Sequence, residues 1–158
     1  MELYSKKEVI NDKELKIKIW DKAGQEQCRS LTRNFFHSTE GIFLIYDITS
    51  LKSFEHVKEW MQCIHDNASQ NVKVVLIGSK CDLEDDRVVT KEDGEKLAKQ
   101  LKLNFFETSA VKNINIREAV IDLVKQVLDV KIEIEEAIKL KHQHDEENDN
   151  KKTGGCGC

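Results

Sequence analysis

Proline is absent from this chain of 158 residues, and glycine occurs only seven times. Four glycines lie in the body of the chain and three lie among its last five residues, a clustering that is typical of a flexible terminal segment. No apolar run reaches the roughly 18 residues that a membrane-spanning helix needs. The formal net charge of −4 excludes the basic surface with which a nucleic-acid-binding domain attracts phosphates. These absences leave the composition of one compact globular domain with a charged surface.

Alternating and continuous apolar patterns predict the β-strands. Between residues 15 and 19, leucine and isoleucine alternate with lysine, which is the period of a strand with one solvated face. A shorter strand that includes Val9 and Ile10 precedes it, and Asn11-Asp12-Lys13 is typical of a hairpin turn between them. Three further segments are predominantly apolar, as strands buried on both faces are: residues 41–46, 72–77 and 103–106.

Apolar residues at helical spacing fall between these runs. The first predicted helix has Ser53 as its N-cap and continues to Ile64, and the second follows Thr90 as its N-cap. The third begins at Ile116 and runs past Ile138. Strands that alternate with helices predict an α/β fold of three layers, in which a mostly parallel sheet has helices on both faces.

The composition changes after Leu140. Residues 141–152 contain no apolar side chain, so this stretch cannot bury enough apolar surface to fold. The sequence therefore predicts a domain over residues 1–140 and a flexible tail over residues 141–158.

The segment Trp20–Glu26, with the sequence WDKAGQE, follows a predicted strand. In a doubly wound sheet, ligands bind beyond the carboxyl ends of the strands. There Asp21 is suited to hold Mg²⁺ through water, Gly24 to let a backbone N–H approach a terminal phosphate, and Gln25 to orient an attacking water. Taken singly, each residue is also ordinary for a strand end, a turn and a helix start.

A second segment, Gly78–Asp82, follows the apolar run that ends at Ile77. The carboxylate of Asp82 can accept hydrogen bonds from the N1–H and the exocyclic amine of guanine, a pattern that adenine does not present. The alkyl stem of Lys80 can cover the base. A plain surface loop is the alternative interpretation.

These two segments and a third, Glu107–Val111, resemble in order and spacing the WDTAGQE, NKCD and ETSAK motifs of small GTPases. Residues Arg29–Phe36 resemble the switch II helix of Rab proteins, and Tyr46–Thr49 matches their YDIT. Over roughly residues 6–128 the chain therefore resembles a Rab-type small GTPase.

The resemblance implies binding of GTP or GDP with Mg²⁺, and slow hydrolysis of GTP. It makes Gln25 the catalytic residue and Asp21 the residue that holds Mg²⁺ through water, while the N–H of Ala110 would reach guanine O6. Carried over position by position, the nucleotide-binding residues are Asp21, Gly24, Ser79, Lys80, Asp82, Ser109, Ala110 and Val111.

The resemblance also makes Trp20 and Phe35 members of the aromatic patch that Rab effectors contact, with core packing as the alternative. The chain departs from the family at Lys22, Ser79 and Val111, where threonine, asparagine and lysine are usual. Because Ser79 has a shorter side chain with fewer polar groups than asparagine, we expect it to tether the site more weakly.

The chain ends in Cys156-Gly157-Cys158, which resembles the ending that carries two geranylgeranyl groups in Rab proteins. One lipid chain gives only marginal membrane binding, whereas two give stable attachment. A metal-binding or disulfide pair is the alternative interpretation. Lipidation at Cys156 and Cys158 would place the protein on the cytosolic face of intracellular membranes.

No part of the sequence matches GxxxxGK[ST], the loop that cradles nucleotide phosphates. The resemblance implies that this loop, the first strand, the first helix and switch I are absent, since Met1 corresponds to a position near the family's second strand. The family's strand order, 2-3-1-4-5-6, makes the missing strand central. We expect either that its two neighbours pair directly or that the chain is unstable, because each unpaired buried group costs roughly 1–3 kcal/mol.

The sequence thus predicts a Rab-type guanine-nucleotide switch protein of vesicle traffic that lacks its phosphate-binding loop. The implied partners are effector proteins, exchange and activating factors, a prenylation escort protein and a membrane, but no nucleic acid. The alternative is a lipidated interaction module without a nucleotide cycle. The combined guanine motifs disfavour a doubly wound domain for another ligand, such as a flavin.

Overall fold

The computed structural model describes residues 2–10, 13–21, 36 and 38–153. The N-terminal segment forms an antiparallel hairpin of strands β1 (Glu2–Ile10) and β2 (Lys13–Asp21), as the alternation predicts. Cross-strand pairing places Ile10, Leu15 and Ile17 on one face. Ile10 is buried and the other two are half-buried, so this is the covered face of the hairpin.

Three strands form a parallel sheet in the order β3-β4-β5: β3 (Gly41–Asp47), β4 (Lys73–Ser79) and β5 (Asn104–Thr108). The middle strand, β4, is buried from Val74 to Gly78, which confirms that its continuous apolar run marks a strand covered on both faces.

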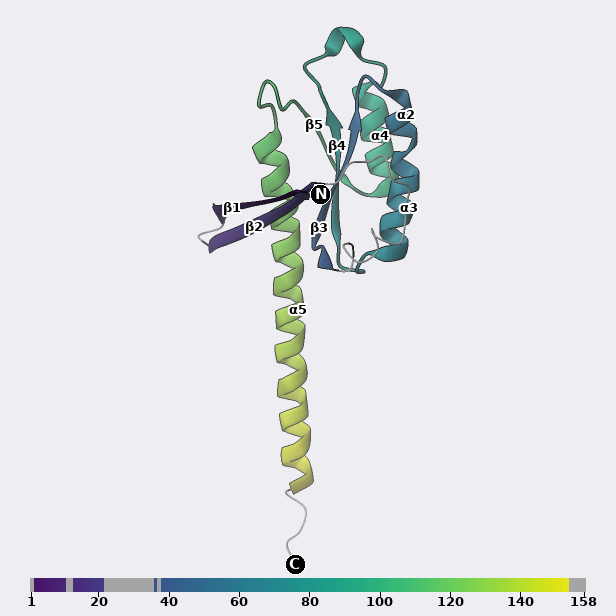
Figure 1. The fold of residues 1–158 in the computed structure, drawn as a ribbon. Coiled ribbons are helices and arrows are strands. Elements are labelled where there is room, and N and C mark those ends of the chain that lie inside the picture. Colours follow the sequence, from purple (N-terminus) through teal and green to yellow (C-terminus); the bar gives the residue numbers. More distant parts are fainter. Residues whose placement is uncertain (1, 11–12, 22–35, 37, 154–158) are drawn as a thin grey trace, which may run out of the picture.

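Helices cover both faces of this sheet. Helices α2 (Leu51–Glu55), α3 (Val57–Asn67) and α4 (Lys91–Leu101) lie on one side, and α5 (Ile116–Thr153) lies on the other (Figure 1). A short 3-10 helix, η1 (Glu84–Asp86), follows β4. The predicted three-layer α/β fold is confirmed.

Two apolar clusters hold the layers together, and β4 contributes alternate residues to each. Leu76 enters the larger cluster, against α3 and α4, while Val75 enters the smaller one, against Leu123 of α5. Both β4 side chains are completely buried, and burying a side chain of this kind stabilises a fold by roughly 1.5–3 kcal/mol.

Hydrogen bonds at the helix starts confirm one predicted cap and correct another. The Thr90 hydroxyl accepts from the Asp93 N–H at 3.1 Å, so Thr90 caps α4 as predicted. The N-cap of α2 is Ser50, not Ser53, because the Ser50 hydroxyl accepts from the Ser53 N–H at 3.3 Å. The prediction of Ser53 is wrong because this helical segment begins before its apolar side does.

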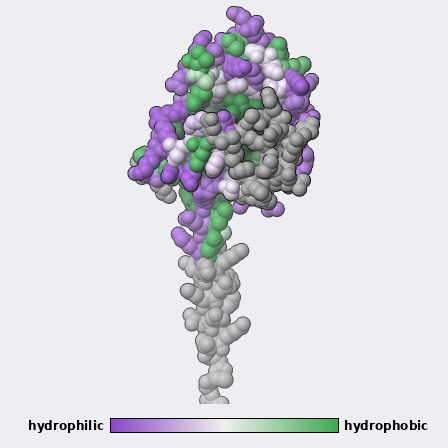
Figure 2. All heavy atoms as spheres, viewed as in Figure 1, coloured by the Kyte–Doolittle hydropathy of each residue, from purple (hydrophilic) through white to green (hydrophobic). Residues whose placement is uncertain are grey.

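Helix α5 continues without a break to Thr153, so residues 141–153 are helical rather than the predicted flexible tether. Residues 116–153 contain neither proline nor glycine and are rich in Glu, Lys and Gln, which favour helix even where nothing packs against them. The projecting part of α5 carries exposed apolar residues, Ile132, Ile134 and Ile138 (Figure 2). Within the described residues, no helix combines the length and apolarity needed to cross a membrane.

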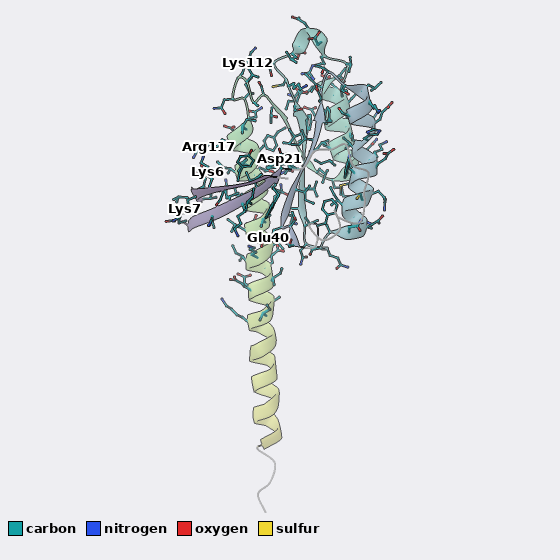
Figure 3. The ribbon with its side chains drawn as sticks, viewed as in Figure 1. Lys6, Lys7, Asp21, Glu40, Lys112 and Arg117 are labelled. Atoms are coloured by element: carbon teal, nitrogen blue, oxygen red, sulfur yellow. The ribbon has the colours of Figure 1, made fainter. Side chains whose placement is uncertain are left out.

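The hairpin and the parallel sheet are separate. In the residues that the structure describes, no strand pairing joins β2 to β3, so the expectation of direct pairing is wrong. The hairpin lies beside α5 instead, with Lys6 close to Arg117 (Figure 3). A hydrogen bond from Lys6, and more weakly the charge of Arg117, hold the pKa of Glu8 below its usual value. Since Ile10 is buried on the same face of β1, the hairpin covers its apolar side without extending the sheet.

We predict that Gly94→Ala destabilises the domain. Gly94 is buried in α4, and a Cβ atom there would collide with Tyr46 Oη and lie 2.6 Å from Phe105 Cζ. Alanine is the better helix former by about 1 kcal/mol, but overpacking a buried site costs about 1–3 kcal/mol. We expect a net loss of about 1 kcal/mol in the free energy of unfolding, measured by urea denaturation.

Tyr46→Phe provides the control for this variant. The Tyr46 hydroxyl is buried and has no hydrogen-bond partner among the described residues, so its removal should cost little stability. In the Tyr46→Phe background Gly94→Ala should be better tolerated, because one of the two colliding groups is gone. Equal losses in both backgrounds would contradict this account of the packing.

Candidate functional site

The carboxyl ends of the three parallel strands lie in line at one edge of the sheet. Asp47 pairs with Ser79, and Ser79 pairs with Thr108, so the loops that follow β4 and β5 start side by side. The Cys81 N–H donates to the Thr108 carbonyl at 3.0 Å and joins these two loops. The predicted base-binding residues of both loops therefore belong to one edge.

Ser79 ties the end of β4 to β3. Its hydroxyl donates to the Tyr46 carbonyl at 2.7 Å, and the Ile48 N–H donates to the Ser79 carbonyl at 3.1 Å. The next residue, Lys80, has φ of 64°, a left-handed conformation that is uncommon outside glycine. The chain therefore turns sharply at Lys80 and leaves its side chain exposed.

Lys80 forms an ion pair with Asp47 at the end of β3. Its Nζ lies 2.6 Å from Asp47 Oδ2, while Asp47 Oδ1 accepts from the N–H and the hydroxyl of Thr49 at 2.8 and 2.7 Å. Partial burial alone would raise the pKa of Asp47, but Lys80 and Thr49 together hold it below its usual value. Asp47 in turn raises the pKa of Lys80. Both partners are charged at neutral pH.

Asp82 is held by the loop after β5. A hydrogen bond from the Ser109 hydroxyl is the largest cause that lowers the pKa of Asp82, and it outweighs the opposing effect of desolvation. Ser109 is completely buried, so this donor is fixed by the fold. At neutral pH the Asp82 carboxylate is therefore an ionised group that only accepts hydrogen bonds.

The loop after β5 is closed tightly on itself. Ser109 and Ile114 exchange backbone hydrogen bonds of 3.1 and 2.9 Å, and the Lys112 N–H donates to the Ser109 hydroxyl at 3.0 Å. Between them Ala110 is exposed and Val111 is 87% exposed. The loop thus presents the backbone of Ala110 at the surface, close to Asp82 through Ser109.

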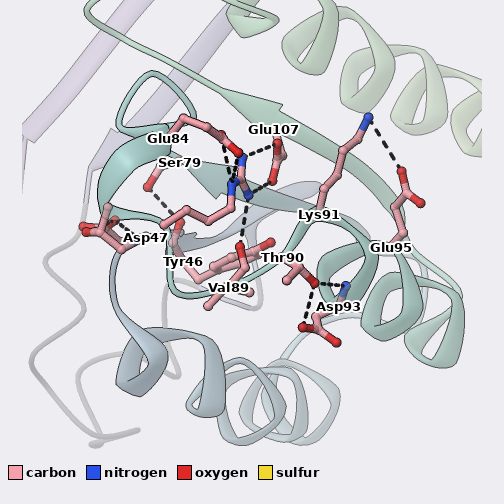
Figure 4. A network of polar contacts seen from close by, with 12 residues as sticks. Tyr46, Asp47, Ser79, Glu84, Val89, Thr90, Lys91, Asp93, Glu95 and Glu107 are labelled. Atoms are coloured by element: carbon pink, nitrogen blue, oxygen red, sulfur yellow. Dashed lines mark hydrogen bonds and ion pairs between the residues drawn. The ribbon is translucent and has the colours of Figure 1, made fainter.

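A buried arginine clamps the same two loops from the side. Arg87 donates to both carboxylate oxygens of Glu107, at 2.6 and 3.0 Å, and also to Glu84 and to the Val89 carbonyl (Figure 4). The Arg87 and Glu107 side chains are only 14% and 12% exposed. Because Asn115 also donates to the Glu107 carbonyl, at 2.8 Å, this clamp fixes the base of the loop after β5.

A cleft of about 670 Å³ lies beside this clamp, against α4 and β5. Its walls include Arg87, Ala98, Phe105 and Glu107. Cys81 lines it as well, whereas its neighbours Lys80 and Asp82 do not, so the cleft adjoins the edge that carries the predicted base-binding residues.

The predicted phosphate and metal residues are not brought to this edge by the described part of the chain. Asp21 is exposed at the end of β2, on the hairpin, and lies well away from Lys112 of the β5–α5 loop (Figure 3). Trp20, the predicted effector-facing residue of this segment, is 51% exposed. Five predicted residues lie outside the described residues: Gly24, Gln25, Phe35, Cys156 and Cys158.

Mg²⁺ does not fit the described residues by themselves. They contain no group of three or more side chains that could hold a metal ion. No hydrolytic step can therefore be derived from the described residues.

Two residues of the site, Asp47 and Arg87, have no role assigned from the sequence. Asp47 directly follows a buried strand, and a carboxylate at the carboxyl end of a parallel strand is the signal that indicates it. Arg87 has no such signal, because its partner Glu107 is 20 residues away.

Comparison with known proteins identifies the family. The Ras family model matches residues 1–129. The Ras-related protein Rab-10 of Diplobatis ommata is 44% identical over 119 residues, which are 75% of this chain and 60% of that protein. Rab-8A of Gallus gallus is 42% identical over 127 residues, 78% of this chain and 61% of that protein. The GTP-binding protein ypt2 of Schizosaccharomyces pombe is 42% identical over 126 residues, 80% and 63% of the two chains.

The fold is that of an α/β domain with a parallel sheet between helices, and the chain belongs to the Ras family. Its similarity to Rab proteins confirms the resemblance to a Rab-type small GTPase. The chain spans about 60% of the length of the Rab-10 and Rab-8A proteins that it matches.

We predict that Arg87→Met lowers the free energy of unfolding by about 3 kcal/mol, because it leaves the Glu107 carboxylate buried without its partner. The double variant Arg87→Met/Glu107→Leu should recover most of this loss, since no charge is then left buried. Urea denaturation measures both effects.

Lys91→Met is the matched control, because Lys91 forms a solvated pair with Glu95 at 3.8 Å. Breaking that pair should leave the unfolding midpoint nearly unchanged. If the Arg87 variant behaves like this control, the clamp does not stabilise the loop.

Proposed function

We propose that this chain is the guanine-recognising part of a Rab-type switch protein, which binds GTP and GDP, hydrolyses GTP slowly and recruits effectors in vesicle traffic. The observation that supports this proposal is the bond from the Cys81 N–H to the Thr108 carbonyl, which joins the loop of Asp82 to the loop of Ala110 at the carboxyl edge of the sheet. In this position the Ser109 hydroxyl lowers the pKa of Asp82. Guanine offers two adjacent N–H donors to such a carboxylate, and adenine does not. The relative ypt2 is named a GTP-binding protein, in keeping with this assignment.

The base contacts are divided among three residues of this edge. Asp82 accepts from N1–H and the exocyclic amine, the exposed backbone N–H of Ala110 donates to O6, and the Lys80 stem covers the ring. Ser79, Ser109 and Val111 shape the two loops around them. Because Ser109 is completely buried, it acts on the base through Asp82.

The phosphates and Mg²⁺ need a further segment, because no stretch of this sequence matches GxxxxGK[ST]. The sheet has room for it. Within the described residues the outer edge of β3 has no strand partner, and Ile45 of β3 is 58% exposed. A strand added beside β3 would pair its free backbone groups and cover Ile45. We therefore assign the phosphate-binding loop to a segment outside this sequence, at the β3 edge.

Hydrolysis would depend on the segment that follows β2. In a completed site Asp21 would hold Mg²⁺ through water, and the Gly24 N–H would face the terminal phosphate. Gln25 would orient the attacking water. Lys22 lies within this segment, in the position of the family's threonine. We therefore expect the turnover rate to differ from that of family members with threonine there.

The surface and the tail supply the remaining partners. Trp20 and Phe35 contact effectors, and exchange and activating factors act on the nucleotide site. An escort protein presents the chain for geranylgeranylation of Cys156 and Cys158, which holds it on the cytosolic face of an intracellular membrane.

A second candidate function is a lipidated interaction module without a nucleotide cycle. The placement of Asp21 favours it, because Asp21 lies on the hairpin and Asp82 follows the separate parallel sheet. In that case the residues of the base edge have a structural role and bind no base.

We predict that the 158-residue chain binds no GTP at micromolar concentration, because phosphate contacts supply much of the affinity in P-loop proteins. A chimaera that carries the N-terminal segment of Gallus gallus Rab-8A ahead of Met1 should bind GTP and prefer it to ATP. In this chimaera Asp82→Asn should weaken GTP about tenfold to hundredfold, since an amide places a donor against a donor. Calorimetry measures all three.

Asp86→Asn, the same chemical change at an exposed residue of η1, is the matched control and should leave GTP affinity unchanged. An Asp82→Asn chimaera that binds GTP as well as its parent shows that Asp82 is not the specificity residue. A folded chimaera that binds no nucleotide supports the interaction module instead.

We predict that the chimaera expressed in eukaryotic cells carries geranylgeranyl groups on both Cys156 and Cys158 and partitions to membranes. Each lipid contributes about 0.8 kcal/mol per buried CH₂, so one chain gives reversible contact and two give lasting attachment. Cys156→Ser should make attachment transient, and the double variant should leave the protein in the soluble fraction. Mass spectrometry and fractionation measure these outcomes.

Cys81→Ser, which removes the free cysteine of the domain, should not alter the partition. A chimaera with no lipid on either terminal cysteine contradicts the anchor. Lipid on the chimaera but not on the 158-residue chain leaves the anchor in place and shows that the escort protein needs the completed domain.

A further inference from the structure

The base edge contains a charged residue to which neither the motifs nor the proposed contacts assign a role. Asp47 ends β3, one strand away from the loop that carries Lys80 and Asp82. Its carboxylate is 2.6 Å from the Lys80 ammonium, and its side chain is only 21% exposed, against 56% for Lys80. The pair therefore joins an anchored carboxylate to an otherwise mobile lysine.

The anchoring of Asp47 is visible in its hydrogen bonds. One carboxylate oxygen, Oδ1, accepts both the N–H and the hydroxyl of Thr49. The Asp47 N–H donates to the Ser53 hydroxyl at 3.0 Å, and that hydroxyl donates to the Ser50 carbonyl at 2.8 Å. These bonds tie Asp47 to the start of α2 and leave Oδ2 directed at Lys80.

The backbone of Lys80 complements this arrangement. Its left-handed conformation and the bond from the Leu83 N–H to the Lys80 carbonyl, at 3.0 Å, hold the start of its side chain. With the backbone fixed at one end and the ammonium fixed at the other, the four-carbon stem has few conformations left. In an exposed lysine without such a partner, the stem samples many conformations because its four bonds rotate freely.

We propose that Asp47 is a positioning residue of the base site: its carboxylate holds the Lys80 ammonium, so that the alkyl stem of Lys80 is ordered for contact with a guanine base before the base arrives. This inference rests on the proposed function. It assigns Asp47 no contact with the nucleotide, and its effect on binding passes through Lys80. Ordering the stem in advance removes part of the entropy loss that binding would otherwise require.

The test uses the full 158-residue chain with guanosine as the probe, because guanosine needs no phosphate loop, and adenosine as its control. Titration followed by nuclear magnetic resonance gives the Kd for guanosine and, from the Cε signals, the pKa of Lys80. We expect Asp47→Asn to lower the pKa of Lys80 and to weaken guanosine about threefold to tenfold. Asp47→Glu, which restores the charge, should recover part of both effects.

Lys80→Met removes the ammonium, which is the exposed partner of the pair, and retains the apolar stem. This variant provides a second test if Asp47 variants fold poorly. In this background Asp47→Asn should cause no further loss of guanosine affinity, because both substitutions disorder the same stem. Glu40→Gln is the matched control: it breaks the 2.6 Å pair between Glu40 and Lys131, remote from the base edge, and should change neither readout.

Three results would overturn the inference. The pKa of Lys80 could stay the same in Asp47→Asn, or the guanosine Kd could stay the same in that variant. The third is that Asp47→Asn weakens guanosine equally in the parent chain and in the Lys80→Met background. A chain that binds guanosine no better than adenosine contradicts the proposed function itself, and the inference falls with it. A chain that prefers guanosine but does not depend on Asp47 contradicts the inference alone.

Discussion

The in-register ending of three parallel strands is the constraint on which the site depends. Hydrogen bonds between neighbouring strands fix Asp47, Ser79 and Thr108 on one line, so the loops that leave β4 and β5 begin within reach of each other. A slip of one residue in either ladder would turn alternate side chains to the wrong face and separate Asp82 from Ser109. The buried side chains of β4 prevent that slip, because they fill different apolar clusters on the two faces.

Each of the two carboxylates at this edge is fixed by a different partner. Asp47 forms an ion pair with Lys80, whereas the neutral Ser109 hydroxyl lowers the pKa of Asp82. Arg87 pairs with Glu107 away from the edge. The base of the loop after β5 is therefore fixed without a third charged group at the edge. This division of partners leaves Asp82 as the acceptor of the edge.

The candidate nucleotide-binding residues fall on two separate parts of the described structure. Those proposed for the base follow the parallel sheet, whereas Asp21 ends β2 on the hairpin. Among the described residues the outer edge of β3 has no strand partner, and Ile45 of β3 is exposed.

The sequence by itself determined the strands and the layer order, because apolar periodicity is a local property of the chain. It also predicted the cap at Thr90, which depends on residues three positions apart. Contacts between distant residues were decided only by the tertiary structure. The pair of Asp47 with Lys80 and that of Arg87 with Glu107 arise from the packing of neighbouring strands and loops. The hairpin lies beside α5 and not at the edge of the parallel sheet (Figure 1), since the position of a sheet edge depends on contacts between distant segments.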